Sequence, residues 1–227
     1  MIMFFSSVFG THNRAGEIIY KRLQGTNFEI TIITFTEINN NNADRDTLEL
    51  IFGDGTSAKV ARTTKQPNYN NYQNIQRNTY VTQHLYGGTG TYLLSVLDPN
   101  RNGGVVNIPN SIERKFYIES YLNITLGSSN NSAVLTRDPI AFACNGIPFY
   151  YNPGAYDPDG DSLHFEMVPC KADFGLDIPD YKFPDATKEF SIDPNNGILT
   201  WDSPITAGEY NVAIRISEYR KVITANG

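Results

Sequence analysis

The stretch YNVAIRIS, residues 210–217, alternates apolar and polar side chains along its whole length. Its apolar set is Tyr210, Val212, Ile214 and Ile216, and its second set is Asn211, Ala213, Arg215 and Ser217. The stretch LHFEM, residues 163–167, repeats the pattern, with its apolar side chains on alternate positions. A period of two is that of a β-strand with one face on a core and the other in water. Both stretches therefore predict half-buried strands.

Six further stretches are rich in the β-branched and aromatic residues that suit a pleated sheet. They are GEIIYKRL (16–23), FEITIITFT (28–36), TLELIFG (47–53), RNTYVTQHLY (77–86), TYLLSVL (91–97) and RKFYIE (114–119). Turn clusters rich in Gly, Asn and Asp lie between the strands, namely NNNN (39–42), GDGT (53–56), GGTG (87–90), DPNRNGG (98–104) and DPNNG (193–197). Strands that recur about every 8 to 12 residues favour an all-β fold of immunoglobulin-like β-sandwiches. A closed barrel is the lesser alternative.

The length of the chain and a change in its pattern predict two domains. A chain of 227 residues with 40% hydrophobic residues has material for one or two domains. Small polar residues in LGSSNNSA (126–133) interrupt the apolar pattern, and a new strand is expected in PIAFAC (139–144). We therefore expect one sandwich over residues 11–126 and a second over 127–227. The last strand ends close to Gly227, so we expect the second sandwich to be truncated and the natural chain to continue.

Charge and hydropathy exclude some partners and suggest a location. A formal net charge of −6, with no run of Lys or Arg, leaves little to neutralise nucleic acid or anionic lipid. No stretch approaches the roughly 20 apolar residues that span a bilayer. The opening MIMFFSSVFG (1–10) is similar to the apolar core of a secretion signal and is interpreted as a signal remnant, with an ordinary first strand as the alternative.

The two cysteines fit an exported protein. Cys144 and Cys170 are the only ones, and each ends a predicted strand. An isolated pair in an exported β domain is more often a disulfide than a metal site, which usually needs four ligands. The prediction is a Cys144–Cys170 disulfide, and the alternative is two reduced thiols in the core.

Several motifs together resemble the repeats of known surface proteins. FGDG (52–55), followed by HLYGGTGTYLLSV (84–96), resembles the polycystic-kidney-disease (PKD) repeat, although the usual preceding Trp and Asp are missing. AYDPDGDSLHFEM (155–167) and FSIDPNNGILTWDSPITAGEYNVAIRISE (190–218) resemble cadherin-like immunoglobulin-fold repeats of bacterial surface proteins. The resemblance is to secreted gliding-motility-associated proteins of gliding bacteria, which use type IX secretion. It implies a PKD-like unit, a cadherin-like unit, an extracellular or cell-surface location and a role in adhesion or spacing.

Three aspartates on alternate positions, Asp157, Asp159 and Asp161, form the main candidate site. Calcium takes six to eight oxygen ligands, and carboxylates on alternate residues of a tight loop can converge on one ion. An EF-hand is excluded, because Ser162 stands where the loop needs glycine and Val168 where it needs glutamate. The cadherin-like resemblance instead implies a late-strand acid, and here that position is Glu218. The alternative is a solvated acidic turn in which the carboxylates cap local N–H groups.

A second loop with alternating oxygen ligands follows the strand expected at 91–97. Asp98, Asn100 and Asn102 match positions 1, 3 and 5 of an EF-type loop, but position 12 is Pro109. Because asparagine-rich turns are also common for backbone reasons, this loop is the weaker candidate for Ca²⁺.

No arrangement for nucleophilic catalysis is found in the sequence, which lacks Gly-x-Ser-x-Gly, and no enzyme is predicted. Tyr69 and Tyr72 in PNYNNYQN (67–74) could stack on a sugar, and FYYNPGAY (149–156) is a second patch of this kind. The expected function is a structural or adhesive extracellular module that contacts neighbouring repeats, a cell-surface protein or a glycan. The alternative is a carbohydrate-binding or accessory module of a secreted hydrolase.

Overall fold

The first seven strands of the chain form one antiparallel sheet. The computed structural model describes residues 13–38, 44–71, 74–125, 127 and 129–220, so the predicted signal remnant at 1–10 lies outside the described residues. The strands are β1 (Asn13–Gln24), β2 (Asn27–Glu37), β3 (Thr47–Ile51), β4 (Ser57–Pro67), β5 (Ile75–Leu85), β6 (Gly90–Asp98) and β7 (Phe116–Ile124). Their order is β1-β2-β5-β4-β3-β6-β7. Six of these strands are confirmed predictions; β4 is not foreseen by the sequence pattern.

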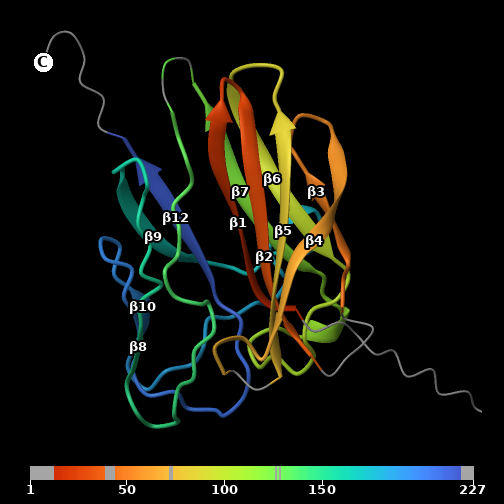
Figure 1. Ribbon diagram of the computed structural model, residues 1–227. Coiled ribbons are helices and arrows are strands. Elements are labelled where there is room, and N and C mark those ends of the chain that lie inside the picture. The colour runs from red at the N-terminus through yellow and green to blue at the C-terminus, as the bar shows by residue number, and fades with distance from the viewer. Residues whose placement is uncertain (1–12, 39–43, 72–73, 126, 128, 221–227) are drawn as a thin grey trace, which may run out of the picture.

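Strand β4 turns this sheet back on itself. Its first part pairs with β3 up to Ala61, and from Arg62 onward it pairs with β5, with an irregularity between Arg62 and Thr64. A bulge of this kind bends a strand and increases its twist. The result is two layers, β1-β2-β5-β4 and β3-β6-β7; the first lies in front of the second in Figure 1. Where β1 approaches β7, a Cβ on Gly16 would lie 3.2 Å from the Phe116 ring.

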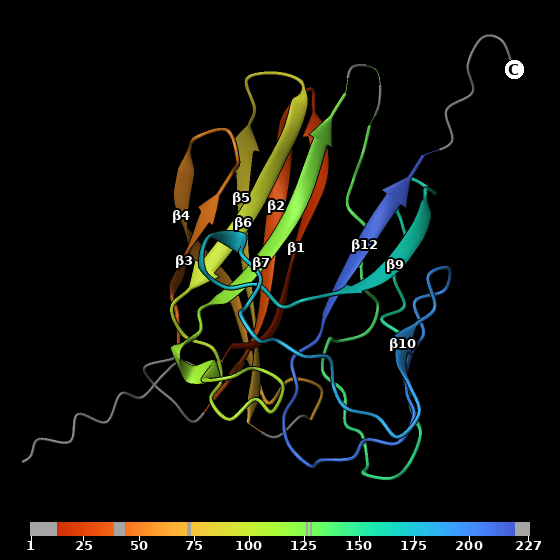
Figure 2. The ribbon, with the colours of Figure 1, turned by 180° about the vertical axis from the view of Figure 1, so that it is seen from behind.

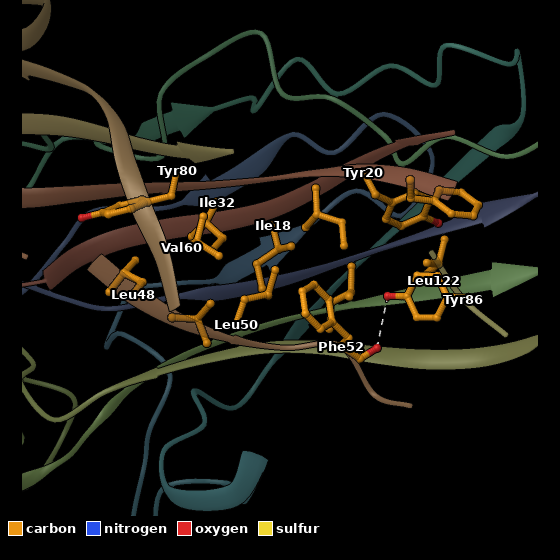
Figure 3. Packing of buried hydrophobic residues seen from close by; sticks show 14 of the residues in the cluster. Ile18, Tyr20, Ile32, Leu48, Leu50, Phe52, Val60, Tyr80, Tyr86 and Leu122 are labelled. Atoms are coloured by element: carbon orange, nitrogen blue, oxygen red, sulfur yellow. Dashed lines mark hydrogen bonds between the residues drawn. The ribbon is translucent and has the colours of Figure 1, made fainter. Parts of the chain in front are cut away.

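The core of the protein lies between these two layers (Figure 3). It collects inward-facing side chains from all seven strands, including Ile30, Leu50 and Leu94, each with no exposed surface. Tyr86 is buried among them, and its hydroxyl donates to the carbonyl of Phe52 at 3.2 Å. Burying one such aliphatic side chain contributes about 1.5–3 kcal/mol, so this core is the main source of stability for the first half of the chain.

The second half of the chain forms two small antiparallel sheets. Its strands are β8 (Phe149–Tyr151), β9 (Ser162–Val168), β10 (Phe190–Ile192), β11 (Leu199–Trp201) and β12 (Ala213–Tyr219). They pair as β10-β11-β8 and β12-β9, so the described part of the chain is all-β apart from the 3₁₀ turns η2 (Tyr69–Asn71), η3 (Ser111–Glu113) and η4 (Asp173–Gly175). Phe165 of β9 and Leu199 and Trp201 of β11 are buried. The strands predicted at 163–167 and 210–217 are confirmed as β9 and, from Ala213, as β12.

The connection between β6 and β7 attaches the second half to the first. Val105 and Ile108 of this connection form a buried cluster with Cys170, Ala172 and Ile178. Beside it, the Arg101 side chain is buried and donates to the carbonyls of Lys115 and Lys171 at 3.1 and 2.8 Å, and to the Asn211 side chain. Since Lys171 and Asn211 belong to the second half, a buried guanidinium spans both halves of the chain.

A second attachment covers the outer face of β2 and β5. Ile33, Phe35 and Ile75 are buried there, and Ile140 packs on them from the second half. The strand predicted over 139–144 is therefore wrong, because the structure assigns no strand to those residues. The apolar residues that suggested a strand there include Ile140, which covers a sheet face.

The predicted Cys144–Cys170 disulfide is also not present. Both cysteines are free: Cys144 is exposed in the segment before β8, and Cys170 is buried in the cluster around Ile108. The prediction took Cys144 as the end of a strand over 139–144, and the structure has no strand there. The alternative interpretation, two reduced core thiols, describes Cys170 and not Cys144.

Candidate metal centre

The loop that leads into β9 carries the three aspartates and is closed by the first of them. Oδ1 of Asp157 accepts the backbone N–H groups of Asp159 and Asp161 at 2.8 and 3.0 Å. Gly160 has φ +81°, a left-handed conformation that favours glycine, and its N–H donates to the Asp157 carbonyl at 3.2 Å. These bonds form the acidic turn expected as the alternative to a metal site. They leave Oδ2 of Asp157 buried without a hydrogen-bond partner among the described residues.

Glu218 on β12 is held by the segment after β7. Its Oε1 accepts the N–H of Ala133, and its Oε2 accepts the Asn130 side chain at 2.9 Å. Burial raises the pKa of Glu218, hydrogen bonds from Asn130 and Ala133 lower it, and the negative charges of Asp157 and Asp161 raise it. Glu218 is thus within electrostatic reach of two of the three aspartates. We call Asp157, Asp159, Asp161 and Glu218 the acidic junction.

The segment after β7 lies between the acidic junction and the edge of β1. Asp159 accepts the N–H and the side-chain amide of Asn131 at 2.6 and 2.9 Å, and Oδ1 of Asn131 accepts the N–H of Arg22 on β1 at 2.8 Å. Ser132 exchanges hydrogen bonds with the backbone of Tyr20, also on β1. Figures 1 and 2 show this segment running between β12 and β1. The acidic junction therefore joins the two halves at the edge of the first sheet.

One cation of the chain, Arg220, lies within the acidic junction. Its Nε and Nη2 donate to the two carboxylate oxygens of Asp161 at 2.8 and 2.7 Å, and Nη2 lies 3.5 Å from Oδ2 of Asp159. It also donates to the carbonyl of Ser129 and to Oδ1 of Asn130. The Arg220 guanidinium therefore holds the β9 end, the loop and the segment after β7 together.

The charges at the acidic junction do not balance when all groups are ionised. The junction holds four carboxyl groups, the Arg220 guanidinium contacts two of them, those of Asp159 and Asp161, and a buried oxygen of Asp157 has no donor among the described residues. Among the described residues, no three His, Cys, Asp or Glu side chains are grouped so that they could hold a metal ion. In this structure the carboxylates are held by hydrogen bonds and by Arg220.

The second candidate loop has other partners. Asp98 is buried, with Oδ2 at 3.1 Å from Nε of Arg45 and Oδ1 accepting the N–H of Asn100 at 2.9 Å. Asn102 is also buried, but its amide donates to Glu209 of the second half at 2.8 Å. The structure therefore directs Asp98 and Asn102 to different partners, and this loop serves the contact between the halves.

The tyrosines considered for sugar binding differ in exposure. Tyr69 packs on Phe35 with ring centroids 6.0 Å apart, and the Arg77 guanidinium lies 5.5 Å above its ring. It is part of the buried contact on β2 and β5, whereas Tyr72 lies outside the described residues. In the second patch, Tyr150 is 65% and Tyr156 51% exposed. Open aromatic surface is thus found at 149–156 and not at Tyr69.

Three residues that contact the acidic junction were not predicted from the sequence. Asn130 and Asn131 lie in a stretch used only to place a domain boundary, and Arg220 follows Glu218 by two positions. The alternation that runs through Ile216 and Glu218 continues to Arg220, which places both charged groups on one face of β12. The two-residue period of this strand could therefore have been used to predict that Arg220 lies on the same face as Glu218.

Comparison with known proteins gives no match: no family model, no curated protein and no solved structure matches the chain. In the part of the chain that the structure describes, no helix has the length and apolar character needed to cross a membrane.

Proposed function

We propose that the chain is a non-enzymatic structural or adhesive module of a large secreted bacterial surface protein. In this proposal it comprises two tandem immunoglobulin-like β-sandwiches, a PKD-like unit over 11–126 and a cadherin-like unit over 127–227. Its location is extracellular, and its neighbours are further repeats of the same chain. The observation that carries the proposal is the acidic junction, where the segment after β7, the loop before β9 and the end of β12 meet against β1.

The proposed cation at this junction is Ca²⁺. Asp157, Asp159, Asp161 and Glu218 would hold it, and the unpaired buried oxygen of Asp157 supports this assignment. Carboxylate oxygens are the ligands that calcium prefers, and a bound divalent ion would add positive charge to that of Arg220. The four carboxylates belong to the loop and to β12, so neutralising them would stabilise the junction between the halves.

The extensive contact between the halves supports a mechanical role. In addition to the acidic junction, the Asn107 side chain in the β6–β7 connection donates to the carbonyls of Lys182 and Asn211 at 2.9 and 2.8 Å, and its Oδ1 accepts the N–H of Asn211 at 3.0 Å. Lys171 pairs with Glu119 across the same contact. Paired polar groups and apolar clusters at several separate points fix the relative position of two bodies better than one contact does. A module built this way transmits force along its length.

Thermal unfolding in EDTA and in millimolar CaCl₂ tests the calcium proposal. A ligand that binds only the folded state stabilises it by RT ln(1 + [L]/Kd), so at about 100 times Kd the gain is about 2.7 kcal/mol. We expect calcium to raise the melting temperature of the wild type and to have little effect on Asp159→Ala. Asp193→Ala is the matched control, because Asp193 also caps an exposed turn through Asn195 and Asn196. A wild type that melts identically with and without calcium contradicts the proposal.

The second candidate function is carbohydrate binding, which the exposed rings of Tyr150 and Tyr156 favour. Exposed tyrosine rings can stack on sugar faces while their hydroxyls form hydrogen bonds. Electrophoresis in gels that contain polysaccharide tests this function. Retardation of the wild type that is lost in Tyr150→Ala supports it, and equal mobility in all gels contradicts it.

A further inference from the structure

We propose that the protein associates with a second copy of itself through Phe174 and an apolar pocket beside Ile112. Phe174 of each copy enters the pocket of the other copy, so the contact forms twice in a symmetric dimer. This inference goes beyond the proposed function, and it does not depend on a bound cation.

Phe174 lies at the tip of a short hairpin over residues 170–178. The N–H of Ala172 donates to the carbonyl of Leu176 at 2.9 Å, and the N–H of Ile178 donates to the carbonyl of Cys170 at 2.9 Å. The base of this hairpin is buried in the cluster that it forms with the β6–β7 connection. The hairpin is therefore a fixed support for the residue at its tip.

The ring and the backbone of Phe174 are both unusual. The side chain is 86% exposed, the largest fraction among the exposed large hydrophobic side chains of the described residues, and Leu176 beside it is 66% exposed. The backbone has φ +55° and ψ 25°, a left-handed conformation that bulky residues rarely adopt and that glycine adopts freely. Neither packing within the chain nor the geometry of the turn favours phenylalanine here. An exposed ring on a strained, well-supported turn points to contact with a partner.

An open pocket of about 310 Å³ lies in the β6–β7 connection. Val105, Ile108 and Ile112 supply apolar walls, and Gly103 and Gly104 line the pocket without a side chain. Pockets that hold small ligands measure about 300–1,000 Å³, so this one has room for about one aromatic ring. The chain therefore carries both an aromatic anchor and an apolar pocket that can receive one.

The pocket and the anchor lie close together on the molecule. Two walls of the pocket, Val105 and Ile108, belong to the buried cluster that also holds the base of the hairpin. Lys115, three residues after Ile112, forms an ion pair with Asp173, which directly precedes Phe174. A surface that contains both parts can pair with itself about a twofold axis, because each part then meets its counterpart on the other copy.

Charge does not oppose this association. Within three residues of Ile112 or of Phe174 the chain carries three cations and three anions, namely Arg114, Lys115, Lys171, Glu113, Asp173 and Asp177. Two copies of a surface with equal numbers of both signs meet without net repulsion, although the whole chain has a formal charge of −6.

Sedimentation velocity over a range of protein concentrations, in EDTA and physiological salt, tests this inference. We expect the wild type to shift from monomer to dimer as its concentration rises. Phe174→Gly should dimerise at least about tenfold more weakly, since burying two phenylalanine rings contributes more than one tenfold step in affinity. The same variant should melt at an equal or higher temperature, because glycine fits the left-handed backbone. Leu85→Ala, which truncates an exposed hydrophobic side chain of β5, is the control and should dimerise as the wild type does.

A mixture of two variants tests the pairing of anchor and pocket. Ile112→Asp places a charge in the pocket and should weaken the dimer as Phe174→Gly does. An equimolar mixture of the two variants should associate more tightly than either alone, because an intact anchor then meets an intact pocket once per dimer. A mixture that associates no better than the separate variants overturns the twofold contact.

Two further outcomes overturn the inference as a whole. One is a wild type that stays monomeric at millimolar concentration, and the other is Phe174→Gly that dimerises as the wild type does. If Ile112→Asp does not fold, the comparison of Phe174→Gly with the wild type decides alone. Because every measurement is made without calcium, no outcome bears on the proposed function.

Discussion

Glu17 makes the contact between the halves sensitive to pH. It lies half-buried on β1, and burial raises the pKa of its carboxyl from 4.5 to about 7. Arg77 of β5 lowers this pKa, and Asp138, which belongs to the segment covering β2 and β5, raises it. The Asp138 side chain accepts from Asn70 at 2.6 Å, so this second carboxylate is held beside the sheet. The folded protein therefore binds a proton at Glu17 that the unfolded chain has lost at the same pH.

The sign and the size of the effect follow from this difference. Between about pH 4.5 and pH 7 the folded state carries the extra proton, so the free energy of unfolding falls as the pH rises through this window. A pKa difference of about 2.5 units corresponds to at most about 3.4 kcal/mol at 1.36 kcal/mol per unit. Because Glu17 is partly exposed to water, we expect about 1–2 kcal/mol. The contribution is fully present below pH 4.5 and lost above pH 7.

Glu17→Gln imitates the protonated form and removes this dependence. Urea unfolding at pH 4 and pH 8 should show nearly equal stability of variant and wild type at pH 4, and a variant more stable by about 1–2 kcal/mol at pH 8. Glu113→Gln, on an exposed 3₁₀ turn, serves as the control and should follow the wild type at both values. A Glu17→Gln variant with the same difference between pH 4 and pH 8 as the wild type refutes the reasoning.

Two further predictions concern backbone and thiols. Gly53→Ala should destabilise the protein by more than about 2 kcal/mol, because Gly53 has φ +84° and its new Cβ would lie 2.4 Å from the backbone nitrogen of Leu93. Gly55→Ala, with φ +89° and open space around it, should cost about 1 kcal/mol; equal losses in chemical unfolding would contradict this account. Burial raises the pKa of the Cys170 thiol, so a thiol reagent should label Cys144 at once and Cys170 only in denaturant. Failure of native protein to react at all would instead favour the disulfide.

The sequence predicts those strands whose side chains follow a simple pattern. Strand β9 has its apolar residues on alternate positions, so its place in the chain follows from the alternation. Strands β1 and β2 follow instead from their content of β-branched and aromatic residues, since β2 is buried at every position from Ile32 to Thr36. Strand β4, SAKVARTTKQP, is rich in Lys, Arg, Thr and Gln, and it forms because β3 and β5 pair with its two parts. Pairing with neighbours distant in sequence is decided by tertiary structure and has no local signal.

Some residues of the candidate site can likewise be predicted from local sequence, and others cannot. The spacing of Asp157, Asp159 and Asp161 is local, and a single sequence suffices to single it out. The assignment of Glu218 came from the resemblance, and the β9–β12 register brings it to the loop. Arg220 depends on that same register, while the contact of Asn131 with Asp159 depends on how the second half docks on β1. Neither dependence can be read from residue spacing.

Calorimetric titration of metal-free wild type with CaCl₂ tests the central claim most directly, because the proposed function depends on a calcium ion that we propose at the acidic junction. We expect one site per chain, saturating in the millimolar range or below, and loss of that site in Asp157→Asn, which changes the carboxylate whose buried oxygen is unpaired. A wild type that shows no binding at millimolar calcium, or an Asp157→Asn variant that binds as the wild type does, contradicts it.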